Sequence, residues 1–448
     1  MSPTTAERNV LSYMPQLKEA IDSLANPNPT NTTYPVGTPI WRRTMVQLSG
    51  QNRALNELSI ERSGEETEET LVMVHGYGAG LCFFYKNFEP MSRIPGLKLY
   101  ALDMLGMGNS SRPPFKIHAK TREEQVIEAE NWFIDALEEW RKERKIERFT
   151  LLGHSLGGYL AVSYALKYPG HLNKLILASP VGIPKDPYAV NASMPEPGES
   201  TLEQEFTQDQ QTVTESNTTT VTPTSTSTTS AGPGKITPPT MPKRPLPGWL
   251  VWLWDCNVSP FSIVRMTGPL GPRFVSGWSS RRFNHLPPAE AQALHDYSFS
   301  IFKQKGSGEY ALAYILAPGA YARRPVIDRI QDVGRQPIPQ PESESEGDVV
   351  AAAPAKKETG IPIVFMYGEH DWMDAAGGLA AEEKLKQAKI KALLHGTEDE
   401  KRNENGSAKV IIVPKAGHHL YLDNPEFFNE VMKKEMDSTM DEVRRRRA

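Results

Sequence analysis

The stretch Thr150–Gly158 constrains the fold of this chain more than any other, because an apolar run there ends in Gly-His-Ser-Leu-Gly. A short apolar run of this kind is typical of a buried strand, and residues 156–168 continue with the pattern of a helix. Where Gly-x-Ser-x-Gly joins a strand to a helix, the serine occupies a strained turn that exposes its hydroxyl. The glycines are needed because side chains there would collide with the neighbouring strand and helix. We therefore predict that Ser155 is a nucleophile.

Apolar runs alternate with helix-like segments on both sides of this turn. The helical spacing of apolar residues is clearest over residues 121–144, and two short alternating runs within residues 44–60 predict a leading β-hairpin. Runs that are apolar throughout are typical of parallel strands covered on both faces, so the sequence predicts an α/β fold with a mostly parallel, doubly wound sheet. The predicted core strands are Leu71–Val74, Leu97–Leu102, Phe149–Leu152, Leu172–Ala178, Ile361–Tyr367 and Lys409–Val413.

A long insertion separates the fourth core strand from the fifth. Of the 19 residues from 212 to 230, 14 are Ser or Thr, and such a composition cannot bury enough apolar surface to fold, so we expect disorder there. Residues 245–330 are rich in aromatic side chains and helical over 289–302 and 310–316, which predicts a folded cap inserted into the core. We expect an N-terminal arm (1–40), a first core part (41–183), a disordered insertion (184–244), the helical cap (245–330), a second disordered insertion (331–359), a second core part (360–437) and a basic tail (438–448).

A serine nucleophile requires a base within hydrogen-bond reach and a third group that orients this base. Both groups follow Ser155 in the chain: Asp371 comes just after the strand ending at Tyr367, and His418 comes after the strand ending at Val413. Open α/β sheets place their sites at the carboxyl ends of parallel strands, so we expect the three side chains to meet. The alternatives that remain open are His419 for the base and Glu369 or Asp374 for the acid.

Acyl transfer also develops a negative oxygen, which preorganised backbone N–H groups must stabilise. Leu156, at the start of the helix after the nucleophile, is the first predicted donor. The second is Tyr77, in the loop His75–Gly78 that follows an early strand. Asp103 and the turn Gly106–Gly108 follow the next strand, and we expect a structural role for them.

Composition excludes several other classes of function. The net charge of −4 and the pI near 6.3 lack the basic footprint of nucleic-acid binders, so we expect no nucleic-acid partner. The two cysteines, Cys82 and Cys256, have no metal-ligand spacing, and the predicted chemistry requires neither a metal nor another cofactor. No apolar run approaches the roughly 18 to 20 residues of a spanning helix, and the N-terminus lacks a secretory or transit pattern. We therefore expect a soluble or peripheral protein.

Two surface segments have two interpretations each. The run Trp249–Trp254 is either a lip that docks on a membrane, because Trp favours the interface, or part of the packing between cap and core. The arginines Arg444–Arg447 either contact anionic lipid or are solvated.

Six motifs together resemble one family, the abhydrolase-domain 4 and 5 subfamily of the α/β-hydrolases, and within it the fungal cardiolipin-specific deacylases. The resemblance covers roughly residues 70–183, 260–330 and 360–430. Two of its motifs are generic to the superfamily, whereas DWM after the acid strand and the His-x-x-x-x-Asp sequence from His418 to Asp423 are more particular. The motifs are VHGYGAG (74–80), LDMLGMGNSSRP (102–113), GHSLGG (153–158), GSGEYALAYILAPGAYARRP (306–325), YGEHDWMD (367–374) and AGHHLYLDNP (416–425).

The resemblance implies an α/β-hydrolase fold, a phospholipid substrate and peripheral contact with a membrane. The implied reaction is removal of a fatty acyl chain, with cardiolipin converted to monolysocardiolipin, and the family pattern favours His418 over His419. Alternatives are a lysophosphatidic acid acyltransferase and a non-catalytic, lipase-regulating adaptor; the presence of Ser155 argues against the adaptor. The implied location is the inner mitochondrial membrane, with the endoplasmic reticulum or a lipid droplet as alternatives.

Overall fold

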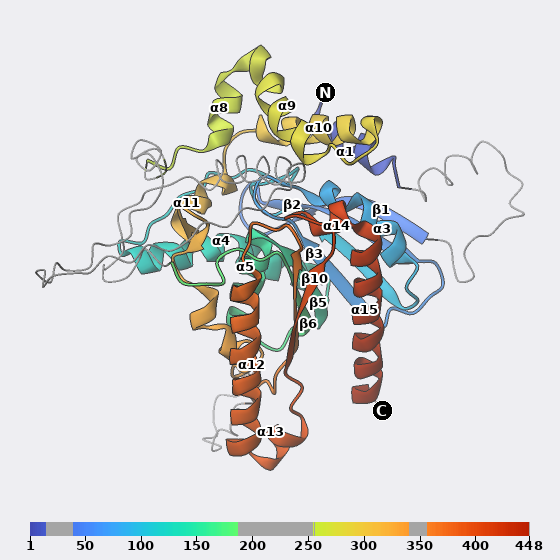
Figure 1. Ribbon diagram of the computed structural model, residues 1–448, viewed down its shortest axis with the longest axis vertical. Helices are drawn as coiled ribbons and strands as arrows, with labels where there is room; N and C mark the ends of the chain where they lie inside the picture. Colours follow the sequence, from blue (N-terminus) through green and yellow to red (C-terminus); the bar gives the residue numbers. More distant parts are fainter. Residues whose placement is uncertain (15–38, 187–253, 255, 340–355, 448) are drawn as a thin grey trace, which may run out of the picture.

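The computed structural model describes residues 1–14, 39–186, 254, 256–339 and 356–447 (Figure 1). Its centre is an eight-stranded sheet with the strand order β1-β2-β4-β3-β5-β6-β9-β10. The pairs β1·β2 and β2·β4 are antiparallel and all other neighbours are parallel, which confirms the predicted α/β class and the leading hairpin. The strands are β1 (Pro39–Gln47), β2 (Ala54–Arg62), β3 (Glu69–Val74), β4 (Leu97–Leu102), β5 (Phe149–His154), β6 (Leu172–Ala178), β9 (Pro362–Gly368) and β10 (Ser407–Val413).

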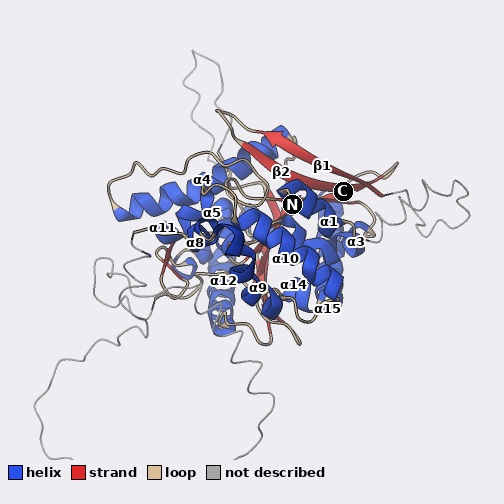
Figure 2. Cartoon of the chain, turned by 90° about the horizontal axis from the view of Figure 1, so that it is seen from above, coloured by secondary structure: helices blue, strands red, loops and turns tan. Residues whose placement is uncertain are grey.

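Helices cover both faces of this sheet, as its fully apolar strands require. Side chains alternate along β3, so Val72 and Val74 pack with α4, α5 and α12, whereas Leu71 and Met73 pack with α3 and α15 (Figure 2). A capping box between Thr121 and Glu124 begins α4. The bounds are α3 (Tyr85–Ser92), α4 (Arg122–Glu143), α5 (Leu156–Lys167), α12 (Ala375–His395), α13 (Glu398–Arg402), α14 (Leu420–Asp423) and α15 (Pro425–Arg447).

The strand order reverses beside β3, and this reversal locates the site. The chain passes from β3 to β4 on one side and then returns to β5 on the other. Val74 pairs with Gly153 across β3 and β5, and Ala178 pairs with Met366 across β6 and β9, so these strands end side by side. Ligands of open α/β sheets bind at such a switch point, beyond the carboxyl ends of the strands.

A group of helices lies over this end of the sheet (Figures 1 and 2). The helix predicted over 289–302 is present as α10, and the segment 310–316 forms two short helical turns followed by a two-residue strand. Phe83 of the core packs edge-on against Phe283 at 5.9 Å between ring centroids. The covering elements are α8 (Pro260–Met266), η3 (Gly268–Leu270), α9 (Gly271–Arg282), α10 (Pro288–Phe302), η4 (Gly308–Ala311) and α11 (Leu312–Ile315), and the smaller elements are η1 (Leu81–Phe84), β7 (Leu316–Ala317), β8 (Tyr321–Ala322), η5 (Val326–Asp328) and η6 (Ile330–Asp332).

The segment predicted as an N-terminal arm (1–40) begins with a helix that packs on the rest of the fold. Helix α1 (Pro3–Leu11) buries Ala6 and Val10 and packs against α10. Glu7 is also buried, and its carboxylate accepts hydrogen bonds from Asn56 at 2.8 Å and Asn109 at 2.6 Å. The sequence pattern missed this helix because the partners of its buried acid lie far along the chain. Residues 15–38 lie outside the described residues.

The predicted basic tail 438–448 is not a separate segment. Helix α15 continues without a break to Arg447, because Thr439 and Met440 extend its buried face by another turn. Arginines at a helix C-terminus also complement the helix dipole. Arg444 donates to Glu68 at 2.9 Å, so this arginine is paired within the chain.

The insertion boundaries also differ from the prediction. Residues 331–339 and 356–359 belong to the described structure, and Arg335 is held by two 2.7 Å hydrogen bonds to Glu404. The greater part of the predicted insertion 184–244 lies outside the described residues, as do 340–355. Of the predicted aromatic lip, Trp254 is buried and donates to the carbonyl of Leu316 at 3.3 Å, which is a packing role; Trp249 and Trp252 lie outside the described residues.

Candidate active site

Ser155 occupies the strained turn that its sequence predicts. It has φ 52° and ψ −116°, between the end of β5 and the first residue of α5. A Cβ atom at Gly153 would lie 2.3 Å from the carbonyl oxygen of Gly157, and one at Gly157 would lie 2.5 Å from that of His75. Both glycines are therefore required for the close approach of α5 to its flanking strands, and this approach aims the Ser155 hydroxyl away from the sheet.

The structure brings Ser155, His418 and Asp371 together. Nε2 of His418 lies 3.0 Å from Oγ of Ser155, and Nδ1 of His418 lies 3.1 Å from Oδ1 of Asp371. Asp371 is held by the N–H of Met373 at 3.0 Å, just beyond the end of β9. With Nδ1 donating toward the carboxylate, Nε2 accepts from the serine hydroxyl, which is the tautomer that a general base requires.

Burial by itself would raise the pKa of Asp371. The charge on His418, together with hydrogen bonds from His418, Ser179 and Met373, outweighs burial and holds the pKa of this carboxyl below its usual value. Asp371 is therefore a carboxylate at neutral pH and can orient a histidine that gains a proton.

The alternative residues have other contacts. His419 is buried against Arg282, whose guanidinium donates to one of its ring nitrogens. Asp374 caps α12 by accepting from the N–H of Ala376 at 2.8 Å. Glu369 accepts from the N–H of Lys415 at 2.8 Å. These contacts give each residue a structural role and favour His418 and Asp371 for the site.

Ser179, which was not among the predicted site residues, follows β6 and is completely buried. Its hydroxyl donates to Oδ2 of Asp371 and lies 2.7 Å from Nδ1 of His418. Its backbone has φ 47°, which turns the chain sharply after the strand. The rule that located Ser155 and Asp371 would also have found it, since Ser179 is the first polar residue beyond the carboxyl end of a central strand.

Two other histidines fix the backbone around the site. Nε2 of His154 donates to the carbonyl of His418 at 3.0 Å, and burial, followed by the neighbouring His418 and Arg282, lowers the pKa of His154 well below its usual value. Nε2 of His75 accepts from the N–H of Met104 at 3.0 Å, so its Nδ1 donates to the carbonyl of Gly76 at 2.7 Å. Both rings are neutral, and their hydrogen bonds hold the backbone at His418, Met104 and Gly76 in place.

The predicted oxyanion donors flank the nucleophile. Gly76 lies against it so closely that a Cβ atom there would be 2.9 Å from Cβ of Ser155, which brings the backbone before Tyr77 to the site. Leu156 is the first residue of α5, and the N–H groups of a helix's first turn have no acceptor within the helix. Tyr77 and Leu156 therefore stay the predicted oxyanion donors, each next to a residue that contacts or adjoins Ser155.

Asp103 has the structural role that we expected. It is fully buried and accepts from the N–H groups of Leu81 at 2.7 Å and Asn109 at 2.8 Å, which ties together the loops after β3 and β4. A Cβ atom at Gly108, where φ is +51°, would lie 2.2 Å from the carboxyl carbon of Asp103. The turn therefore needs glycine for this contact.

An apolar cavity of about 220 Å³ opens from Ser155 and His418 toward α8 and α9. Its walls include Phe261, which stacks on Tyr77 at 5.2 Å and on Phe302 at 4.5 Å between centroids. Apart from three histidines and Ser155, its lining is mostly hydrophobic, with the Arg282 guanidinium as its charged group. The remaining lining residues are Gly78, Phe83, Pro260, Ile263, Val264, Val275 and Trp278.

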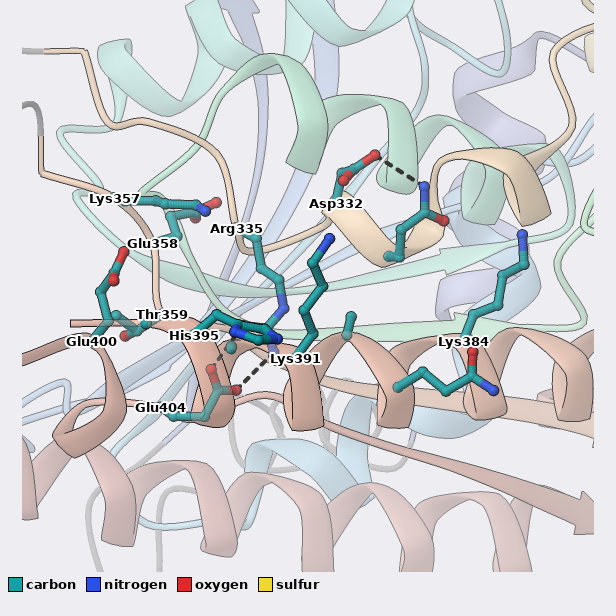
Figure 3. A pocket seen from close by; sticks show the side chains of 15 residues that line it. Asp332, Arg335, Lys357, Glu358, Thr359, Lys384, Lys391, His395, Glu400 and Glu404 are labelled. Carbon is teal, nitrogen blue, oxygen red and sulfur yellow. Dashed lines mark hydrogen bonds and ion pairs between the residues drawn. The ribbon is translucent and has the colours of Figure 1, made fainter. Parts of the chain in front are cut away.

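A larger, polar hollow of about 520 Å³ lies elsewhere (Figure 3). Its lining side chains come from η6, α12, α13 and the segment before β9, so it lies at the amino end of that strand, opposite the serine. Its charges balance: Lys391 and three other cations face four carboxylates, and Arg335 is already paired with Glu404. It contains none of the predicted site residues.

Comparisons with known proteins agree with the fold. The sequence matches the profile of the alpha/beta hydrolase fold family over residues 69–425. A rice protein (Oryza sativa subsp. japonica) named probable 1-acylglycerol-3-phosphate O-acyltransferase is 30% identical over 406 residues, covering 89% of this chain and 73% of that protein. The human (lyso)-N-acylphosphatidylethanolamine lipase is 26% identical, with 88% and 86% covered. Human 1-acylglycerol-3-phosphate O-acyltransferase ABHD5 is also 26% identical, with 89% and 85% covered.

Proposed function

Because the chain belongs to the alpha/beta hydrolase fold family, within the abhydrolase-domain 4 and 5 subfamily, we propose that it is a serine-dependent acyl hydrolase that removes a fatty acyl chain from a phospholipid. The observation that carries this proposal is the 3.0 Å contact between Nε2 of His418 and Oγ of Ser155 at the base of an apolar cavity. A hydroxyl, a base and an oriented carboxylate in this geometry are the machinery of acyl transfer.

In the first half of the reaction, Oγ of Ser155 attacks the ester carbonyl while Nε2 of His418 takes the serine proton. The carbonyl oxygen becomes an oxyanion, which the N–H groups of Tyr77 and Leu156 stabilise. The tetrahedral intermediate then breaks its bond to the alcohol oxygen of the lipid. His418 returns the proton to that oxygen, so the lysolipid leaves and the acyl chain stays on Ser155.

The second half repeats these steps with water. His418 takes a proton from a water molecule as its oxygen attacks the acyl-enzyme, and the ester bond to Ser155 breaks with return of the proton to Oγ. The products are a fatty acid and free enzyme. Asp371 remains a carboxylate throughout and stabilises the histidine when it is charged.

The cavity supports a lipid substrate. An acyl chain that leaves water for a hydrophobic cavity gains roughly 0.8 kcal/mol for each buried methylene group. The guanidinium of Arg282 lies in the wall of this cavity, where it complements a phosphate or other anionic group. Within the phospholipids, the motifs favour cardiolipin, which would be converted to monolysocardiolipin.

Acyl transfer is the second candidate, because the rice relative and human ABHD5 carry acyltransferase names. We infer that the His-x-x-x-x-Asp sequence does not form a second centre, because Asp423 accepts from the N–H of Gly417 at 2.9 Å. His418 also already contacts Ser155. Transfer would therefore use the same acyl-enzyme, with a lysolipid alcohol in place of water.

We propose a catalytic role over that of a non-catalytic, lipase-regulating adaptor, and we also propose a location. An assembled Ser155–His418 contact argues for catalysis over a purely regulatory role. We propose peripheral association with the inner mitochondrial membrane, from the motif resemblance, and imaging of a C-terminally tagged chain against mitochondrial, endoplasmic reticulum and lipid-droplet markers tests it.

A two-substrate assay separates the enzymatic candidates. Purified protein is offered cardiolipin alone, and separately lysophosphatidic acid with acyl-CoA. We expect free fatty acid and monolysocardiolipin in the first mixture, with a Ser155→Ala variant inactive in both. Phosphatidic acid from the second mixture, without any product in the first, would overturn the hydrolase proposal in favour of the transferase.

A further inference from the structure

We propose that α8, η3 and the first turn of α9 form the surface by which this protein docks on an anionic phospholipid membrane. This inference rests on the proposed lipid hydrolysis and names the face of the molecule that meets the substrate's bilayer. We call the residues 258–273 the docking tip.

The docking tip exposes large apolar side chains to solvent. Ile263 is 50% exposed, Met266 is 86% exposed and Leu270 is 54% exposed, and α8 has no buried residue. In Figure 1, α8 and α9 stand at the top of the molecule, above the rest of the fold. Exposed apolar side chains that cluster on a projecting element mark a site of contact with a membrane or a partner.

The charge of the surrounding segment favours a membrane with anionic headgroups. From residue 257 to 286 the sequence has four arginines and no Asp, Glu or Lys. Arg273 is exposed on the first turn of α9, whereas Arg265 is paired with Glu309 at 2.7 Å and Arg282 lies in the cavity wall. An apolar tip within a segment whose only formal charges are positive is complementary to a negatively charged lipid surface.

The docking tip is continuous with the candidate active site. Phe261 and Val264, on the inner side of α8, line the same cavity as Ser155, and Ile263 both lines it and is exposed. Met266 lies on the outer side, at the end of this helix. An acyl chain can therefore pass from a bilayer at the tip into the cavity along apolar side chains alone.

The arginines at the C-terminus cannot share this contact. Helix α15 has 23 residues, which corresponds to about 35 Å of length. It begins near the carboxyl ends of the strands and ends where Arg444 pairs with Glu68, just before β3 begins. Figure 1 shows the C-terminus at the bottom of the molecule, with α8 and α9 at the top. A flat membrane at the tip leaves these arginines in solvent.

Vesicle binding tests the proposal without hydrolysis. Full-length Ser155→Ala protein is co-sedimented with phosphatidylcholine vesicles and with vesicles that also contain phosphatidylglycerol. The double substitution Met266→Gln/Leu270→Gln is expected to weaken binding to the mixed vesicles roughly tenfold or more, because less apolar surface enters the headgroup layer. Arg273→Gln is expected to reduce the preference for mixed vesicles over neutral ones.

The matched control is Leu379→Gln/Leu394→Gln on α12, where the two leucines are 56% and 66% exposed. This control should bind vesicles as the parent does. Equal losses in the two double variants, or undiminished binding by the tip variant, would overturn the proposal. Hydrolysis of a water-soluble short-chain ester, measured with Ser155 restored, should be the same in all these variants; its absence in the unsubstituted protein would count against the proposed function and not against the docking tip.

Discussion

The hydroxyl of Ser179 lies closer to Nδ1 of His418, at 2.7 Å, than Oδ1 of Asp371 does at 3.1 Å. Ser179 donates its own proton to Oδ2 of Asp371, so it can accept the Nδ1 proton of His418 and connect the acid to the base. The carboxylate of Asp371 thus orients His418 both directly and through the hydroxyl of Ser179, which follows the neighbouring strand β6.

Ser179→Ala is expected to lower kcat by roughly 10- to 100-fold with little change in KM, because His418 loses an acceptor that fixes its tautomer. The acid limb of the pH–rate profile should also shift, since the imidazolium loses part of its stabilisation. Steady-state kinetics on a soluble ester measures both effects. Ser300→Ala is the control: this serine is also buried, and its hydroxyl donates within α10 to the carbonyl of Tyr297 at 2.7 Å. Unchanged kinetics in Ser179→Ala would contradict the positioning role.

Only the first of the substitutions Asp371→Asn and Asp374→Asn should reduce activity. The first substitution removes the charge that stabilises the protonated His418, so kcat should fall roughly 10³- to 10⁴-fold while the fold persists. Asp374 only caps α12, and Asn is as good a cap, so both activity and unfolding temperature should be nearly unchanged. Kinetics combined with thermal unfolding of the two variants decides between the acids, and an inactive Asp374→Asn would reverse the assignment.

The two adjacent histidines can be distinguished in the same way. His418→Gln should abolish turnover, because it removes the ring nitrogen that lies 3.0 Å from Oγ of Ser155. His419→Gln should retain a substantial part of the activity on a soluble ester, since a glutamine can still accept from Arg282. Single-turnover measurements are the appropriate assay. Turnover that survives in His418→Gln and disappears in His419→Gln would assign the base to His419.

The buried carboxyl of Glu69 should make the protein less stable as pH rises toward neutrality. Burial raises the pKa of its carboxyl to about 7, although Asn173 and Thr150 donate to it and lower the pKa. Between the ordinary glutamate pKa and about 7, the folded state holds a proton that the unfolded state releases. The free energy of unfolding should therefore fall as pH rises through this window, by an amount on the order of 2 kcal/mol.

Glu69→Gln cannot titrate and should show a shallower slope of unfolding free energy between about pH 5 and pH 7. Urea unfolding at several pH values measures this slope. The exposed Glu66→Gln is the control and should retain the slope of the parent. A slope that is identical in the parent and Glu69→Gln would contradict the buried, proton-holding state of Glu69.

The sequence was sufficient for the parts of the fold that depend on local pattern. Fully apolar runs predicted the parallel core strands, and the glycines of residues 153–157 predicted the turn at Ser155. The positions of Asp371 and His418 followed from strand ends. These features are predictable because backbone hydrogen bonding and side-chain alternation act over a few residues.

Contacts between distant segments were not predictable in this way. Glu7 is buried only because Asn56 and Asn109 meet it across the fold, so the sequence indicated an arm where there is a packed helix. The place of Ser179 just after a strand was predictable, but its contact with Asp371 depends on the pairing of β6 with β9. The exposure of Met266 could not be predicted either, because it depends on the projection of α8 from the rest of the fold.

The most direct test of the account is labelling of the folded protein by a fluorophosphonate, followed by peptide mass spectrometry. We predict a single modified residue, Ser155, with labelling abolished in Ser155→Ala and strongly slowed in His418→Gln. Well-folded protein that takes no label, or that carries the label on another serine, would contradict Ser155 as the nucleophile of an acyl hydrolase.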